Sequence, residues 1–220
     1  MQMQKITLMP SKIERNNKIC SNIFLGLCFF FAVLSIVIAN VYGVVNIEGL
    51  SMWPTANEHA YDISGEKRED KAILNFYASY KLGDIIIAKT GEQYVIKRVM
   101  ALEGDTLTYT TVDEQIKVVR NGQVLEESYI NPASTMNASR ANFLYLKTVD
   151  GIKEYFDGDV LTIPKGYIFY MGDNRDNSSD CNIYGPVPLE HVVARVDFIV
   201  PYGENPFFYA IKTLFKRATH

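Results

Sequence analysis

The fold is decided by the stretch Tyr94-Val95-Ile96-Lys97-Arg98-Val99-Met100, whose β-branched residues predict a β-strand with a lysine at its centre. Alternation along the strand places Lys97 on one face with Val95 and Val99, and Arg98 on the other. An ammonium group among valines loses hydration, which lowers its pKa and can leave a neutral amine that accepts a proton. The alternative is a half-exposed strand whose lysine reaches back to water.

A serine earlier in the chain is a candidate for the group from which this lysine takes a proton. Ser51 lies in the unusual run Glu48-Gly49-Leu50-Ser51-Met52-Trp53-Pro54-Thr55. A serine hydroxyl attacks a carbonyl only when a base takes its proton, and a desolvated lysine is an alternative to histidine in that role. Ser51 and Lys97 are therefore candidates for a nucleophile and its general base.

The chain beyond residue 40 is mainly β. Short runs rich in β-branched residues recur, and Asn121-Gly122 between two of them predicts a tight hairpin. The stretch Glu58–Tyr80 is instead expected to be a loop followed by a short helix, and residues 106–160 are expected to form a smaller β-lobe. The expected strands are Asp84–Lys89, Tyr94–Leu102, Gln115–Arg120, Gln123–Leu125, Leu144–Thr148, Gly166–Met171 and His191–Val200.

The N-terminal region predicts a transmembrane helix at residues 19–39. Ile19–Ala39 contains no charged residue, and about 20 apolar residues span a bilayer as a helix. Four basic residues precede it against the single acid Glu14: Lys5, Lys12, Arg15 and Lys18. The positive-inside rule then places residues 1–18 in the cytoplasm and residues 40–220 outside. The alternative is a cleavable signal peptide, but the apolar stretch is longer than a signal core and no clear small-x-small site follows it.

Composition excludes several classes of function. The net charge is -3, with 22 basic and 25 acidic residues, so no nucleic-acid-binding surface is implied. Two of the three cysteines, Cys20 and Cys28, fall in the predicted span, which leaves Cys181 alone and rules out a disulfide framework. The three histidines show no ligand spacing, so neither a metal nor another cofactor is expected.

The C-terminal run Pro206–Arg217 is short, aromatic and basic. It is too short to span a membrane. Two interpretations stay open at this point: a helix at the membrane interface, and a terminal helix packed on the protein.

A third motif completes the pattern. The polar stretch Gly172-Asp173-Asn174-Arg175-Asp176-Asn177-Ser178 would, alone, be read as a surface loop. Together with Ser51-Met52-Trp53-Pro54-Thr55 and Lys97-Arg98-Val99, and in this order after a membrane anchor, it resembles the bacterial type I signal peptidases. The resemblance covers roughly residues 15–200 and is weakest between 106 and 160. The compact length and single anchor are similar to the Gram-positive members.

The resemblance implies a fold and a reaction. The fold would be a β-rich catalytic core with a smaller inserted β-lobe, similar to that of the self-cleaving LexA-like repressors, which lack the anchor. The reaction would be removal of signal peptides from exported preproteins, after small residues at the -1 and -3 positions. Ser51 matches the family nucleophile, Lys97 matches the general base, and Ser178 matches the serine that orients the lysine amine.

The resemblance also implies supporting residues around that pair. Asp173 and Arg98 match a structural ion pair, and Asp180 matches an acidic residue of the same support. Met52 matches a position that borders the substrate groove. The implied partners are signal peptides, the lipid bilayer and, functionally, the secretion translocon.

Two positions depart from the family pattern. Gly49 stands where Gram-negative members have a serine that helps bind the oxyanion, and Asn182 stands where the pattern has an arginine two residues beyond the acid. We expect a backbone N–H near Ser51 to bind the oxyanion, so that a serine at position 49 would keep or raise activity. The alternative is a glycine required by a positive φ, in which case any side chain is costly.

Two other functions remain as alternatives. A relative dedicated to one pilus or conjugation substrate would share the same residues. A non-catalytic assembly protein would have lost the serine and lysine, and the presence of both Ser51 and Lys97 argues against it.

Overall fold

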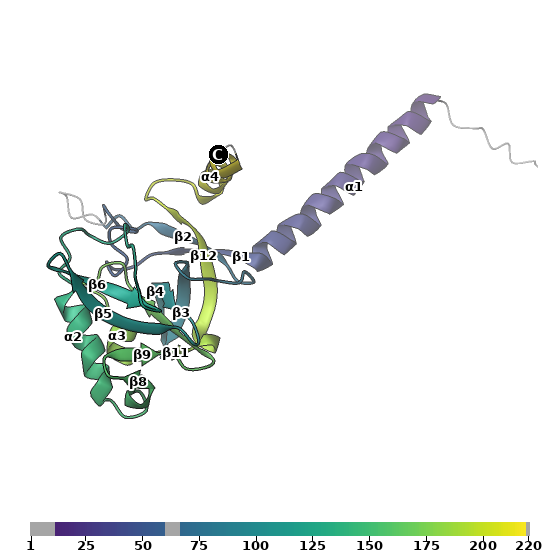
Figure 1. Ribbon diagram of the computed structural model, residues 1–220. Coiled ribbons are helices and arrows are strands. Elements are labelled where there is room, and N and C mark those ends of the chain that lie inside the picture. Colours follow the sequence, from purple (N-terminus) through teal and green to yellow (C-terminus); the bar gives the residue numbers. More distant parts are fainter. Residues whose placement is uncertain (1–11, 60–66, 219–220) are drawn as a thin grey trace, which may run out of the picture. The chain divides into compact units, whose positions relative to one another are not determined.

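The N-terminal unit is a single long helix. The computed structural model describes residues 12–59 and 67–218, and its first element is α1, Lys12–Val41 (Figure 1). The segment Glu14–Val41 is long and apolar enough to cross a membrane, and it contains the predicted span. Its polar side chains bond to the helix itself: Ser35 Oγ donates to the Phe31 carbonyl at 2.8 Å and Asn40 Nδ2 to the Ile36 carbonyl at 2.7 Å. This arrangement suits an apolar environment, which offers no other hydrogen-bond partner. Lys5, in the predicted basic flank, lies outside the described residues.

The second compact unit, residues 42–220, contains two antiparallel sheets. The larger sheet has seven strands in the order β1-β2-β12-β3-β4-β10-β11. Its strands are β1 (Tyr42–Asn46), β2 (Lys71–Asn75), β3 (Ile85–Thr90), β4 (Gln93–Ala101), β10 (Tyr167–Met171), β11 (Val187–Pro188) and β12 (Val192–Val200). The mainly β fold and the apolar N-terminal helix that the sequence predicts are confirmed.

The smaller sheet has five strands in the order β7-β6-β5-β9-β8. They are β5 (Thr106–Val112), β6 (Gln115–Arg120), β7 (Gln123–Val124), β8 (Phe156–Asp157) and β9 (Val160–Thr162). The predicted hairpin at Asn121-Gly122 is confirmed: β6 pairs with β7, and the two turn residues have φ of 51° and 76°. This sheet occupies the part of the sequence where the smaller lobe is expected.

Residues 12–59 and 67–218 also contain four α-helices and three short 3-10 helices. They are α1, α2 (Asn137–Tyr145), η1 (Leu146–Thr148), η2 (Lys153–Tyr155), α3 (Cys181–Tyr184), η3 (Leu189–His191) and α4 (Pro206–Ala218). Phe143 of α2 makes edge-to-face contacts with Tyr109 of β5 and Phe169 of β10, at 5.1 and 6.2 Å between ring centroids. One buried cluster therefore includes side chains from both sheets and from α2, so the smaller sheet shares its core with the larger one.

Two expectations about secondary structure are wrong. Leu144–Thr148, expected as a strand, is the end of α2 followed by η1, and the buried Phe143 and Leu146 are spaced for a helical turn. The stretch Glu58–Tyr80 contains a strand, β2, rather than a helix, because the buried run Ala72-Ile73-Leu74 is paired on both sides in the sheet. Part of that stretch, residues 60–66, lies outside the described residues. The expected strands also do not include β1, β5, β8, β9 and β11.

Candidate active site

Ser51 and Lys97 meet in the folded chain although 45 residues separate them in the sequence. Ser51 lies in the loop after β1, residues 47–59, which we call the nucleophile loop after its candidate nucleophile, and Lys97 lies on β4. Lys97 Nζ is 2.8 Å from Ser51 Oγ and also donates to the Ile96 carbonyl at 3.0 Å. The lysine is only 3% exposed. A nucleophile and a base within hydrogen-bonding distance are the elements of covalent catalysis.

Burial lowers the pKa of Lys97, because removal from water disfavours the ammonium form. The negative charge of Asp180 acts in the opposite direction and offsets part of this effect. The neighbouring Cys181 contributes no charge near neutral pH, because burial raises the pKa of its thiol well above the ordinary value. Desolvation is the larger effect, so the site favours the neutral amine more than water does.

The loop that carries Ser51 is held by a buried asparagine. Asn57 is 2% exposed, and its Nδ2 donates to the carbonyls of Ile47 and Gly49 at 2.7 and 2.8 Å. Its backbone N–H donates to the Asp70 carboxylate at 2.7 Å, and its Oδ1 accepts from the Asp70 N–H at 2.8 Å. Sequence reasoning missed Asn57. Its φ of 59° is in the left-handed region that asparagine tolerates, but a sequence does not show φ.

The loop between β10 and α3, residues 172–180, is called the polar loop and lies directly against Ser51. Asn174 donates its N–H to the Ser51 carbonyl and its Nδ2 to the Leu50 carbonyl, both at 3.0 Å. A Cβ at Gly172 would lie 2.4 Å from the Ser51 carbonyl oxygen and 2.3 Å from Ser178 Oγ. The motif therefore begins with glycine because no side chain fits between these groups.

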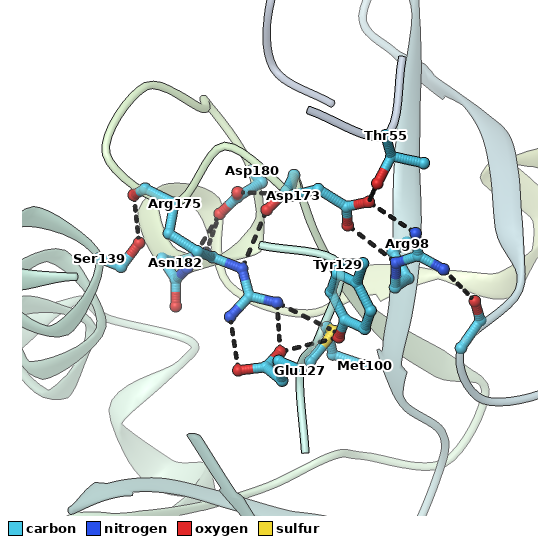
Figure 2. A network of polar contacts seen from close by, with 12 residues as sticks. Thr55, Arg98, Met100, Glu127, Tyr129, Ser139, Asp173, Arg175, Asp180 and Asn182 are labelled. Carbon is cyan, nitrogen blue, oxygen red and sulfur yellow. Dashed lines mark hydrogen bonds and ion pairs between the residues drawn. The ribbon is translucent and has the colours of Figure 1, made fainter. Parts of the chain in front are cut away.

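Asp173 links three segments of the site (Figure 2). Its carboxylate, fully buried, accepts two hydrogen bonds from Arg98 of β4, at 2.8 and 2.6 Å, and one from the hydroxyl of Thr55 in the nucleophile loop. The Arg98 guanidinium also lies 4.0 Å from the centre of the Tyr129 ring. The ion pair thus fixes β4 and the nucleophile loop against the polar loop.

Arg175 of the same loop is buried, and its guanidinium points toward Glu127 (Figure 2). It forms a two-bond ion pair with Glu127, and its Nε donates to the Gly172 carbonyl at 3.0 Å. Its own carbonyl accepts from Ser139 of α2 at 2.7 Å. Glu127 and Tyr129, which sequence reasoning missed, therefore connect the 120–145 region to the polar loop.

An apolar cavity of about 470 Å³ opens beside the serine and the lysine. Its lining residues are Val45, Ile47, Glu48, Ser51, Leu74, Phe76, Ile87, Tyr94, Val95, Ile96, Lys97 and Val193. They come from β1, β2, β3, β4 and β12 and from the nucleophile loop. A small apolar group bound there would lie next to the candidate nucleophile.

Comparison with known proteins agrees with this geometry. The family model described as signal peptidase, peptidase S26, matches residues 20–201, which include all three motifs. The chain belongs to this family. The resemblance to signal peptidases that the motifs indicate is confirmed.

The relatives are named signal peptidases. The signal peptidase I of Bacillus caldolyticus is 32% identical over 162 residues, which cover 69% of this chain and 75% of that protein. Signal peptidase I V of Bacillus subtilis is 28% identical over 175 residues, covering 76% of this chain and 94% of that protein. The signal peptidase I of Rickettsia bellii is 34% identical over 133 residues, covering 53% of this chain but only 46% of that protein.

Asn182, which departs from the family pattern, lies next to Asp180 (Figure 2). The carboxylate of Asp180 accepts from the Asn182 N–H at 3.0 Å, from Asn182 Nδ2 at 3.1 Å and from the Gly172 N–H at 2.9 Å. Asn182 Oδ1 in turn accepts from the hydroxyl of Tyr109 at 2.9 Å. An amide thus holds the acid in place in this chain, without adding a positive charge.

Two predicted site residues are placed differently from the expectation. The hydroxyl of Ser178 is buried, but within residues 12–59 and 67–218 it has no hydrogen-bond partner, so no bond joins it to Lys97 in this structure. Met52 is 1% exposed and belongs to the core cluster with Ile47 and Ala56, rather than to the lining of the cavity.

Gly49 has a φ of +76°, and a Cβ built there would meet no atom within 4 Å. The space around it is open, but its backbone conformation is one that residues with a side chain adopt only with strain. The positive φ supports the explanation that the backbone conformation at position 49 requires glycine. Serine and alanine at position 49 should then be similarly costly, contrary to the expectation that serine is beneficial.

Proposed function

We propose that this chain is a membrane-anchored serine endopeptidase that removes N-terminal signal peptides from exported preproteins, with Ser51 as nucleophile and Lys97 as general base. The observation that carries the proposal is the 2.8 Å separation of Lys97 Nζ and Ser51 Oγ beside an apolar cavity. Membership in the signal peptidase family supports the choice of substrate.

The reaction divides into two steps that use the same base. Neutral Lys97 takes the hydroxyl proton of Ser51 as the oxygen attacks the scissile carbonyl, and the resulting ammonium gives that proton to the leaving amine. The product is an ester between Ser51 and the signal peptide. Lys97, neutral again, then takes a proton from water as the water oxygen attacks the ester. The ammonium gives this proton to Ser51 Oγ as the ester bond breaks, so the signal peptide leaves as a carboxylic acid that ionises in water and the pair returns to its starting state.

The tetrahedral intermediates need hydrogen-bond donors for the oxyanion. Gly49 has no side-chain donor, so we assign this role to the backbone N–H of Ser51. The loop supports the assignment, because Asn57 and Asn174 hold the backbone on both sides of the serine. Ser178 is assigned to the lysine amine, because its buried hydroxyl has no hydrogen-bond partner in the described part of the chain and lies on the same side of Gly172 as the Ser51 carbonyl.

An extended peptide fits the edge of β4. Along Gln93–Arg98 this strand pairs with β3, whereas its described pairing with β10 begins only at Arg98. The second edge of Tyr94–Lys97 is thus free of strand pairing in the described part of the chain, and these residues line the cavity. A substrate strand added at this edge would place its side chains alternately toward the cavity and away from it. This alternation would place the -1 and -3 side chains together on the side of the cavity.

We place the catalytic unit outside the cytoplasm, with α1 as a single anchor and the N-terminus inside. The excess of basic over acidic residues before the apolar stretch supports this topology. Action on preproteins that leave the secretion translocon would follow from it. No observation favours a dedicated pilus or conjugation substrate.

One assay tests the proposed function directly. The full chain in detergent is incubated with an exported preprotein, and the N-terminus of the product is sequenced. We expect one new N-terminus, at the junction that follows small residues at -3 and -1. An uncut preprotein, or cuts at sites unrelated to the signal peptide, would contradict the proposal.

The pH dependence of cleavage should report the state of Lys97. Below its pKa the amine already holds a proton and cannot act as a base, so activity should rise as the pH rises through that pKa. Because burial lowers this pKa, the acid limb should lie below the ordinary lysine value of about 10.4. The measurement is kcat/KM for a signal peptide as a function of pH.

Two variants assign the groups that tune the lysine. Asp180→Asn removes the charge that raises the pKa of Lys97, so the acid limb should move to lower pH. Ser178→Ala should also shift the acid limb of the pH profile, because the Ser178 hydroxyl is assigned to the Lys97 amine. An unchanged limb in Ser178→Ala would show that Ser178 does not act on Lys97.

A further inference from the structure

Helix α4 is a well-defined element with a clear beginning. It starts at Pro206, a residue whose fixed φ suits the first helical position. Asn205 caps it, because its Oδ1 accepts from the N–H groups of Phe207 at 3.0 Å and Phe208 at 3.3 Å. The helix follows β12 after a short turn (Figure 1).

The helix turns its polar side toward the domain. Tyr209, Thr213 and Arg217 are four residues apart and therefore lie on one face. All three line a cavity of about 230 Å³ together with residues of β12, and the Arg217 guanidinium lies 5.2 Å from the centre of the Phe198 ring. Contact with the rest of the domain thus uses a tyrosine, a threonine and an arginine.

The opposite side of α4 is apolar and faces outward. An amphipathic helix of a globular domain normally packs its apolar face inward, so this orientation is inverted. The relevant residues, with their exposed fractions, are Phe207 67%, Phe208 68%, Ile211 36%, Leu214 54% and Phe215 70%.

The charges of α4 have one sign. Residues 206–218 contain Lys212, Lys216 and Arg217 and no acidic residue. Lys212 is exposed and lies beside the apolar face rather than opposite to it. Exposed aromatic side chains flanked by basic ones are the composition of helices that lie in a membrane interface and are attracted to anionic lipids.

We propose that α4 lies on an anionic bilayer surface, with its apolar face among the headgroups and acyl chain ends. At 13 residues it is about 20 Å long, which is too short to cross a hydrocarbon core of about 30 Å. It would act as a second, peripheral attachment in addition to the spanning helix α1. A protein partner would bury the same apolar area, but the uniformly basic charge favours a lipid surface. The proposal goes beyond the proposed function and does not depend on peptidase activity.

The experiment uses the full chain reconstituted in vesicles of phosphatidylethanolamine and phosphatidylglycerol. An environment-sensitive fluorophore is attached to Leu214→Cys, in a background where the exposed Cys20 and Cys28 are replaced by alanine and the buried Cys181 is kept. The matched control is Tyr145→Cys on α2, because Tyr145 is as exposed (68%) as the residues of α4 but lies on another element. Spin-labelled lipids and aqueous iodide are the two quenchers.

At position 214 we expect loss of emission with spin-labelled lipid and protection from iodide, and at position 145 the reverse. Replacing phosphatidylglycerol with phosphatidylcholine, or Lys212 with glutamine, should weaken the lipid quenching at 214. Equal iodide quenching at both positions would overturn the proposal. So would protection at 214 that grows with protein density while lipid quenching stays absent, because that result would show contact between copies of the chain.

Discussion

Replacing Ser51 with alanine is expected to abolish cleavage of a signal peptide, with a loss on the order of 10⁴-fold or more in kcat. The reason is geometric: Ser51 Oγ is the hydroxyl that Lys97 Nζ approaches, at 2.8 Å. Lys97→Met should cost about as much, because it removes the base and leaves a side chain of similar length. The double variant should be little worse than either single one, because nucleophile and base act as a unit.

The thermal stability of Lys97→Met shows whether its loss of activity comes from the missing base or from unfolding. Since burial lowers the pKa of Lys97, the folded chain binds this proton less tightly than the unfolded chain, which costs stability at pH values below the ordinary lysine pKa. Lys97→Met removes that cost, so its thermal unfolding near neutral pH should occur at no lower temperature than in the parent. The matched control is Lys89→Ala on β3, an exposed lysine of the adjacent strand, which should retain full activity.

If Ser51→Ala cleaved the signal peptide at a rate near that of the parent, Ser51 would be excluded as the nucleophile. Substantial turnover by a stable Lys97→Met would exclude the lysine as the base. Either result would leave family membership intact but would contradict the proposal that Ser51 and Lys97 act together as nucleophile and base.

The candidate pair Ser51 and Lys97 could be proposed from sequence only by combining three motifs. A lysine in a strand of valines is, alone, more often a half-exposed side chain that reaches water. The serine in the run Gly49–Thr55 and the motif around Asp173 together make the other interpretation the better one. Strands β4, β6 and β12 were also predictable, because each is a run rich in β-branched residues.

The elements and residues that sequence reasoning missed lack a periodic pattern in the sequence. Strand β2 is buried on both faces, so its apolar run lacks the alternation that marks a strand. In β5, the run Thr106–Val112 is only partly buried and mostly threonine, so its apolar signal is weak. Asn57 and Glu127 act through contacts to backbone or to one distant arginine. Such contacts leave no pattern in the residues around them.

Asp173→Ala is expected to destabilise the folded chain by about 3–5 kcal/mol, the usual cost of leaving one member of a buried ion pair without its partner. The carboxylate is fully buried, and the side chain of Arg98 is only 12% exposed. The variant also releases the Thr55 hydroxyl, so the nucleophile loop loses a contact to the polar loop. Thr55→Val removes only that hydrogen bond and should cost about 1 kcal/mol.

The measurement is urea unfolding of the full chain in detergent, followed by the fluorescence of the single tryptophan, Trp53, which lies two residues from the nucleophile. Asp150→Ala provides the matched control, because Asp150 also pairs with a basic residue, Lys153, but is 90% exposed. Exposed pairs of this kind contribute little, so its unfolding midpoint should stay close to that of the parent. If Asp173→Ala unfolded at the same urea concentration as Asp150→Ala, the ion pair with Arg98 would not be what holds the nucleophile loop, β4 and the polar loop together.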